Sequence, residues 1–143
     1  MVKKQTCCNT AGRKRGVIAV GLGLLLGLFS AYVSYRRGLL LWMGWSEALF
    51  WACIFNRTLI GVGVWLGGWL MQHPFFSPKH LAWWRGMEIG GLVSIGLGIF
   101  MFSLSKNHGW ENFWLIVLSG SLYGMLIDLV ATRYAGEGKT LIK

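Results

Sequence analysis

Charge is scarce in this chain, and negative charge is the scarcest of all. Charged residues make up 13% of the 143 residues, and only five residues are acidic. Soluble domains carry about 25% charged residues, so too few are present here to cover a water-exposed surface. Proline is also rare, at Pro74 and Pro78 alone, so long stretches run without a helix breaker. A soluble globular domain is therefore excluded, and long uninterrupted helices are expected.

Side chains that carry chemistry are few and scattered. The chain has no Cys-x-x-Cys motif, no histidine inside an apolar stretch, and no recognisable Ser-His-Asp or paired-carboxylate arrangement. The sequence therefore predicts no catalytic residue, no metal site and no cofactor, and a protein that is not an enzyme. Cys7 and Cys8 fall on the cytoplasmic side of the topology predicted below, where a disulfide is not expected. Free thiols and palmitoylation are the two alternatives for them.

Four long apolar stretches fill most of the chain. A transmembrane helix needs about 20 apolar residues, and the chain is 55% hydrophobic. The sequence thus predicts an all-α polytopic membrane protein, with four transmembrane helices in a tightly packed, glycine-rich bundle. Leu39 to Trp45 is expected at the membrane interface, and Ser46 is expected to cap the second helix. The predicted boundaries are 1–15 for a basic cytoplasmic tail, 16–134 for the transmembrane domain with spans at 16–35, 46–71, 80–104 and 112–134, and 135–143 for a cytoplasmic C-terminal tail.

The basic residues predict the orientation in the membrane. The net charge is +9, and ten basic residues fall on the side that holds both termini, against three on the other side. The positive-inside rule then places both termini in the cytoplasm, for a multi-pass protein of a prokaryotic inner membrane. A cleaved signal peptide is the rival interpretation of the first span, but an apolar run of about 20 residues is too long for one. Nucleic-acid binding is not expected, because no binding fold accompanies the charge.

Glycine is abundant, with 21 residues, and it is regularly placed. Each predicted span carries one pair of glycines four residues apart. Helices in lipid associate through such small residues, because these let two backbones approach closely. The sequence does not decide which pairs act within one chain and which act between subunits. The predicted packing pairs are Gly23 and Gly27, Gly63 and Gly67, Gly86 and Gly90, and Gly120 and Gly124.

Five polar residues form a predicted intramembrane polar cluster: Asn56, Arg57, Arg85, Glu88 and Asp128. A charge at the membrane centre costs about 2.5–3.5 kcal/mol, so each is expected to have a partner. Arg57 is the deepest and is expected to pair with Glu88 or with Asp128, with Arg85 as a competing partner for both acids. Such a cluster either fixes the register of the helices or lines a path for an ion or a proton.

A sequence pattern links part of this cluster to other proteins. The stretch Phe55 to Gly61, then Arg85-Gly86, then Gly120 to Asp128 resembles a pattern in small uncharacterised prokaryotic four-helix membrane proteins. The resemblance covers the second to fourth spans. It carries no catalytic or binding residue across, and it implies only that Asn56, Arg57, Arg85 and Asp128 are worth mutating.

The function expected from the sequence is that of a non-enzymatic integral membrane protein. It would act as an accessory or assembly subunit of a membrane complex, or as a self-associating bundle. Its expected partners are the lipid bilayer and other membrane-protein subunits or further copies of itself, with no nucleic acid. The alternative is a small oligomeric channel or transporter that uses Arg57, Glu88 and Asp128.

Overall fold

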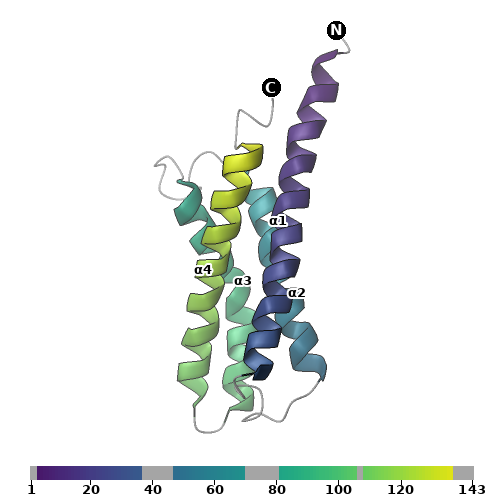
Figure 1. The fold of residues 1–143 in the computed structure, drawn as a ribbon. Coiled ribbons are helices and arrows are strands. Elements are labelled where there is room, and N and C mark those ends of the chain that lie inside the picture. The colour runs from purple at the N-terminus through teal and green to yellow at the C-terminus, as the bar shows by residue number, and fades with distance from the viewer. Residues whose placement is uncertain (1–2, 37–46, 70–80, 106–107, 137–143) are drawn as a thin grey trace.

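The computed structural model describes residues 3–36, 47–69, 81–105 and 108–136. Within these ranges every regular element is a helix: α1 (Lys3–Arg36), α2 (Glu47–Gly67), α3 (Ala82–Leu104) and α4 (Gly109–Ala135). The helices run alternately up and down, so both chain ends lie at the same end of the bundle, called the terminal end below (Figure 1). All four are long and apolar enough to cross a bilayer. The predicted fold class, an all-α membrane protein with four spanning helices, is confirmed.

The helix boundaries differ from the predicted spans by three residues or more in three places. Helix α4 begins at Gly109 instead of Asn112. Helix α1 begins at Lys3, well inside the stretch predicted as a tail. Helix α2 ends at Gly67 instead of Met71, and residues 68–69 form a turn. In this turn the Gly68 N–H donates to the Val64 carbonyl at 3.1 Å. Several predicted features lie outside the described residues: the segment 39–45, the cap at Ser46, the span ends at Met71 and His80, and most of the tail from 135; the side chains of Cys7 and Cys8 are likewise not described.

Helices α3 and α4 meet backbone to backbone. A Cβ atom on Gly86 would lie 2.8 Å from the carbonyl carbon of Gly124, and one on Gly124 would lie 2.9 Å from the Cα of Gly90. A Cβ atom on Gly90 would overlap the Gly120 carbonyl oxygen. Real Cβ atoms do not approach other atoms this closely, so the spacing of these two helices requires glycine at each position.

The other glycine pairs also face helices of the same chain. On α1, a Cβ atom on Gly23 would lie 2.7 Å from the Arg57 carbonyl oxygen of α2. On α2, a Cβ atom on Gly63 would lie 2.7 Å from a methyl carbon of Ile89 on α3. By contrast, a Cβ atom on Gly96 would have nothing within 4 Å. The eight predicted packing glycines thus point inward, whereas Gly96 of α3 faces outward.

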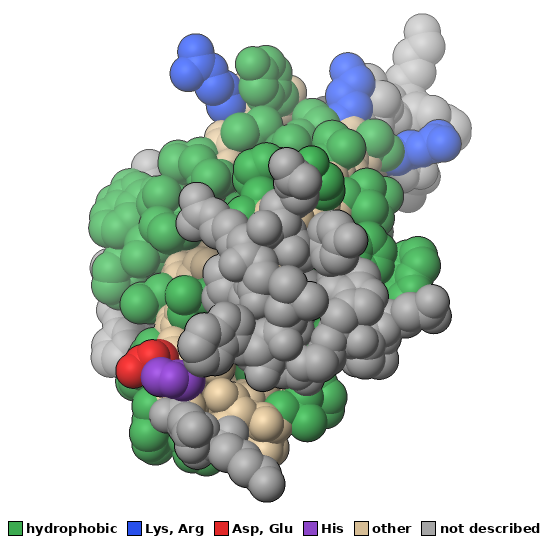
Figure 2. Space-filling model, turned by 60° about the horizontal axis from the view of Figure 1, so that its bottom comes forward, with side chains coloured by type: hydrophobic (Ala, Val, Ile, Leu, Met, Phe, Trp, Pro, Cys, Tyr) green, Lys and Arg blue, Asp and Glu red, His purple; other side chains and the backbone are tan. Residues whose placement is uncertain are grey.

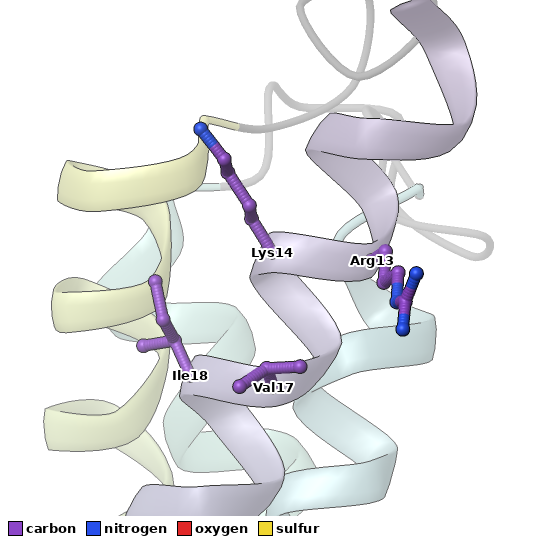
Figure 3. A pocket seen from close by; sticks show the side chains of 4 residues that line it. All are labelled: Arg13, Lys14, Val17 and Ile18. Carbon is purple, nitrogen blue, oxygen red and sulfur yellow. The ribbon is translucent and has the colours of Figure 1, made fainter. Parts of the chain in front are cut away.

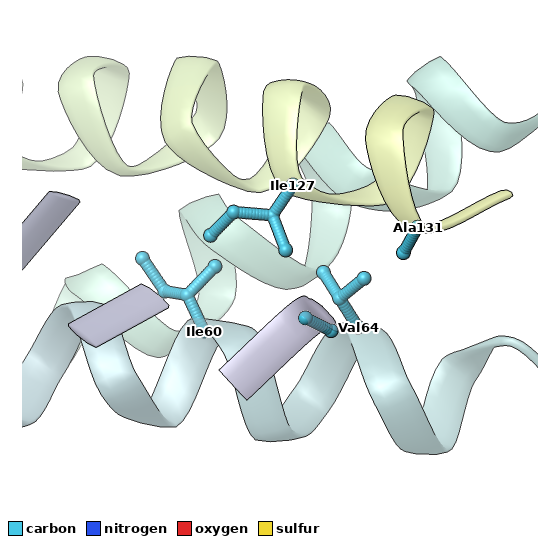
Figure 4. Close-up of a cluster of buried hydrophobic side chains, with 5 residues drawn as sticks. Ile60, Val64, Ile127 and Ala131 are labelled. Carbon is cyan, nitrogen blue, oxygen red and sulfur yellow. The ribbon is translucent and has the colours of Figure 1, made fainter. Parts of the chain in front are cut away.

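Large apolar side chains mostly point away from the bundle axis. Leu25, Phe55 and Leu92 are 63%, 66% and 69% exposed. Hydrophobic side chains accordingly cover much of the surface in Figure 2, and the basic side chains drawn there lie toward the top of that view. The interior is instead narrow and built from smaller side chains. Its main apolar cluster, at the centre of the bundle (Figure 4), consists of Ala19, Ile60, Val64, Ile127 and Ala131.

Replacing Gly90 by alanine is expected to destabilise the bundle by about 1–3 kcal/mol, because the new methyl group overlaps the backbone of α4. Thermal unfolding in detergent, followed by circular dichroism, measures the change. The matched control on the same helix is Gly96→Ala, whose methyl group meets open space. Equal melting temperatures for the two variants would show that α3 and α4 are not held at this spacing.

Candidate functional site

Asp128 of α4 is the centre of a buried ion-pair network. Its side chain is fully buried, as is that of Arg15, and Arg85 is 2% exposed. Arg85 of α3 donates from Nε to Oδ2 at 2.8 Å and from Nη2 to Oδ1 at 3.0 Å, a two-point contact with the carboxylate. Arg15 of α1 donates to the same Oδ1. One carboxylate therefore joins the first, third and fourth helices.

Neutral groups complete the network around Asp128. The Thr132 hydroxyl, one turn further along α4, donates to Oδ1 at 3.2 Å and accepts from Arg15 Nη1 at 3.1 Å. Arg15 also donates to the Gly136 carbonyl at 2.7 Å and to the Val64 carbonyl of α2 at 3.4 Å. Every helix of the bundle thus contributes at least one group to this network, and most of its partners are separated by long stretches of sequence.

The backbone leaves room for these large side chains. A Cβ atom on Gly68 would overlap the guanidinium of Arg15, and one on Gly86 would lie 2.9 Å from the Cβ of Asp128. The C-terminal residue of the network, Gly136, has a φ of 80°, a conformation that favours glycine. Glycine therefore serves the charge network as well as the packing of the helices.

Arg15 is the member of this network that the sequence analysis missed. In the sequence it follows Arg13 and Lys14, and the three residues together resemble an ordinary basic tail. The helix separates them: Arg13 and Lys14 are exposed, whereas Arg15 faces the bundle. A signal for this was present, because Arg15 is four residues before Ala19 and eight before Gly23, and so lies on the packing face of α1.

The predicted pairing of Arg57 with Glu88 or Asp128 is wrong. Both oxygens of Asp128 are engaged by Arg85, and Oδ1 also accepts from Arg15. Glu88 is half-buried and accepts a hydrogen bond from the Trp84 indole at 2.6 Å, one turn away on its own helix. The depth of each residue along its helix had suggested these pairs, but depth does not fix the direction in which a side chain points.

Arg57 of α2 lies in a second polar cluster made of neutral groups. Its guanidinium donates to the Ser94 hydroxyl at 3.2 Å and to the Ser119 hydroxyl at 2.7 Å. Its Cζ atom lies 4.6 Å from the centre of the Tyr123 ring, which is a cation–π contact. Asn56 donates to the same Ser94 hydroxyl at 3.2 Å. The predicted polar residues therefore separate into two clusters, with Arg85 and Asp128 in one and Asn56 and Arg57 in the other.

The two clusters differ in how they compensate charge. Arg57 is only 4% exposed, yet no carboxylate among the described residues contacts it. The Nε atoms of Arg57 and of Arg15 both donate no hydrogen bond there, so the absence of a carboxylate is the difference between the clusters. Two hydroxyls and one aromatic ring stabilise this cation but do not neutralise it. The Arg57 cluster is therefore suited to attract an anionic group, whereas Asp128 already has its counter-ions.

Metal binding has no support in the described part of the chain. No group of three or more His, Cys, Asp or Glu side chains there is arranged to hold a metal ion. Cys53 is a half-buried free thiol, one helical turn from Arg57.

Comparisons with known proteins add no candidate role, since no family model, no curated protein and no solved structure matches this chain. The resemblance to small four-helix membrane proteins therefore stays a prediction. The two polar clusters and the surface of the bundle are the features that bear on its function.

Replacing Asp128 by asparagine is expected to destabilise the protein by about 3–5 kcal/mol, because two buried guanidinium groups lose their counter-ion. Unfolding in detergent would measure the loss. In a double-mutant cycle, Arg15→Met and Asp128→Asn are expected to couple by more than about 0.5 kcal/mol.

Two controls accompany this cycle. Arg57→Met combined with Asp128→Asn is expected to be additive, because no hydrogen bond or ion pair among the described residues joins the two clusters. Glu111→Gln, at an exposed His108 pair, is expected to change stability by less than about 0.5 kcal/mol. Coupling of Asp128 to Arg57 instead of Arg15 would contradict the network.

Proposed function

We propose that this chain is a non-enzymatic structural subunit of the membrane, acting in an assembly with other membrane-protein subunits or with copies of itself. The observation that carries the proposal is the buried network at Asp128. Its three charged side chains are at most 2% exposed, and the single carboxylate of Asp128 is the shared ion-pair partner of Arg15 and Arg85. Charges that fix the relative positions of four helices are what a stable scaffold needs, and a conduction path would require them to face water.

The paired glycines support the same proposal. Each predicted pair contacts another helix of the same chain, so these pairs act to hold one bundle together. Contacts with a second subunit would then use the outward surface. Gly96 is suited to this, because it is open and is flanked by the exposed side chains of Leu92 and Phe100. A partner helix could approach the backbone of α3 closely at that point.

The second candidate function is a small oligomeric channel or transporter, and the observation that favours it is Arg57. A buried cation that no carboxylate of the described residues contacts is a place where a passing anion would be stabilised. Glu88 and Asp128 do not share its cluster, so a pathway would depend on Arg57 with Ser94 and Ser119. The transported species would then be an anion.

Purified protein in lipid nanodiscs is expected to form an oligomer, or a stoichiometric complex when extracted with native lipid, as measured by native mass spectrometry. Gly96→Leu is expected to reduce association without lowering the melting temperature, because its side chain faces outward. Gly90→Leu is the contrasting variant and is expected to unfold the bundle. A monomer under all these conditions would contradict the subunit proposal.

The same preparation distinguishes the second candidate. Liposomes that contain the protein are expected to show no more halide flux than empty liposomes. Flux that Arg57→Met abolishes while Asn56→Ala retains it would support the channel or transporter and contradict the structural subunit.

For orientation, we propose that both termini are cytoplasmic, on the basis of ten basic residues against three. A reporter enzyme that is active only outside the cytoplasm is expected to be inactive when fused after Lys143. The same reporter fused to a chain truncated after Ser105, at the other end of α3, is expected to be active. The reverse pattern would show that the bundle is inserted the other way.

A further inference from the structure

One open pocket lies on the surface of α1 near the terminal end (Figure 3). Its volume is about 260 Å³, and its described lining consists of Arg13, Lys14, Val17 and Ile18. Lys14 and Ile18 point toward the side on which α4 ends (Figure 3). Neither polar cluster of the bundle interior contributes to this pocket, so it has no part in the functions considered so far.

Two basic side chains and two apolar side chains line the pocket, and the basic ones come first along α1. Arg13 and Lys14 are exposed, and no hydrogen bond or ion pair with a described residue engages either charge. Val17 and Ile18 follow them by four residues, and Val17 is 68% exposed. Four residues correspond to about 6 Å along a helix, so two charges stand one turn above two apolar side chains. The order runs from the end of the helix toward the middle of the membrane.

The expected depth of these four side chains in the membrane agrees with the order of charged and apolar residues along α1. The candidate membrane-spanning stretch of α1 includes Ala11–Ser34, so Arg13 and Lys14 lie toward its terminal end and Val17 and Ile18 lie one turn deeper. At these depths Arg13 and Lys14 would meet lipid phosphates, and Val17 and Ile18 would meet the start of the acyl chains. Basic pockets at such positions bind the headgroups of anionic phospholipids. Arg13 adds a planar donor group that can hold two phosphate oxygens at once.

We propose that this pocket binds an anionic phospholipid of the surrounding leaflet. Lys14 holds the phosphodiester, and Arg13, which points to the other side of α1 in Figure 3, joins it when its exposed side chain turns toward the lipid. The first part of an acyl chain packs on Val17 and Ile18. The proposal requires only that the chain spans a membrane, and it holds for either orientation and for either candidate function. A soluble phosphate compound would contact only the two charged side chains. Contact with Val17 and Ile18 is therefore the feature that distinguishes a bound lipid.

The experiment uses the full chain in nanodiscs of phosphatidylcholine with about one tenth phosphatidylglycerol, a proportion low enough to reveal a preference. Native mass spectrometry after release measures the phosphatidylglycerol retained per chain. Wild-type protein is expected to retain it selectively over phosphatidylcholine. The Arg13→Gln/Lys14→Gln variant is expected to lose about tenfold or more of this selectivity, because each basic residue contributes to headgroup attraction. Both substituted side chains are exposed, and the melting temperature verifies the fold.

Three comparisons make the test decisive. Arg133→Gln removes an exposed charge from the same end of the bundle, outside the pocket, and is expected to retain selectivity within about twofold. Lys14→Arg should retain it too, whereas Val17→Ser should weaken retention without removing a charge.

If Lys14→Gln and Arg133→Gln lose the same amount of selectivity for phosphatidylglycerol, the proposal is overturned and the binding is due to general surface charge. Displacement of the lipid by glycerol phosphate, or no effect of Val17→Ser, would overturn it in favour of a soluble anion.

Discussion

The sharing of one carboxylate by two guanidinium groups is the interaction on which the rest of this bundle depends. Lipid offers no counter-ion to a buried charge, so Arg15 and Arg85 must both reach Asp128. That requirement sets the rotation of α1 and α3 toward α4, and it explains why glycine stands at Gly68 and Gly86, where a side chain would displace the network. The close helix contacts and the ion pairs therefore depend on each other, because both form only when the helices have the same register.

The buried arginines show two ways of holding a cation inside a membrane protein. Arg85 has a carboxylate in a two-point contact, which fixes its position. Arg57 has hydroxyls and a ring face, which stabilise the cation and leave it able to attract an anion. The first arrangement is suited to a permanent joint between helices. The second arrangement could change its partner, which is why the Arg57 cluster carries the alternative function.

The fold could be predicted from the sequence, whereas the site could be predicted only in part. Hydropathy and length identify spanning helices because the bilayer thickness is fixed, so four apolar stretches give four helices. The same reasoning gave the depth of Asp128 and Arg57, but depth does not give rotation about the helix axis, so Arg57 received the wrong partner. Arg15 was missed because charge counting treats a basic residue before a span as a signal for orientation, although its spacing from Ala19 and Gly23 places it on the packing face. The exact end of α2 was not predicted either, because span length alone does not specify the turn over residues 68–69.

The ion pair between the first and last helices also has a consequence for biosynthesis. Arg15 and Asp128 are 113 positions apart in the chain, so at about 5–20 residues per second α1 leaves the ribosome roughly ten seconds before its counter-ion exists. During that interval Arg15 and Arg85 lack the carboxylate that they share in the finished bundle. A chain that stops before α4 therefore keeps two basic side chains on its packing faces without Asp128, and the position of one acidic residue near the end of the last helix makes the finished bundle chemically different from every shorter product.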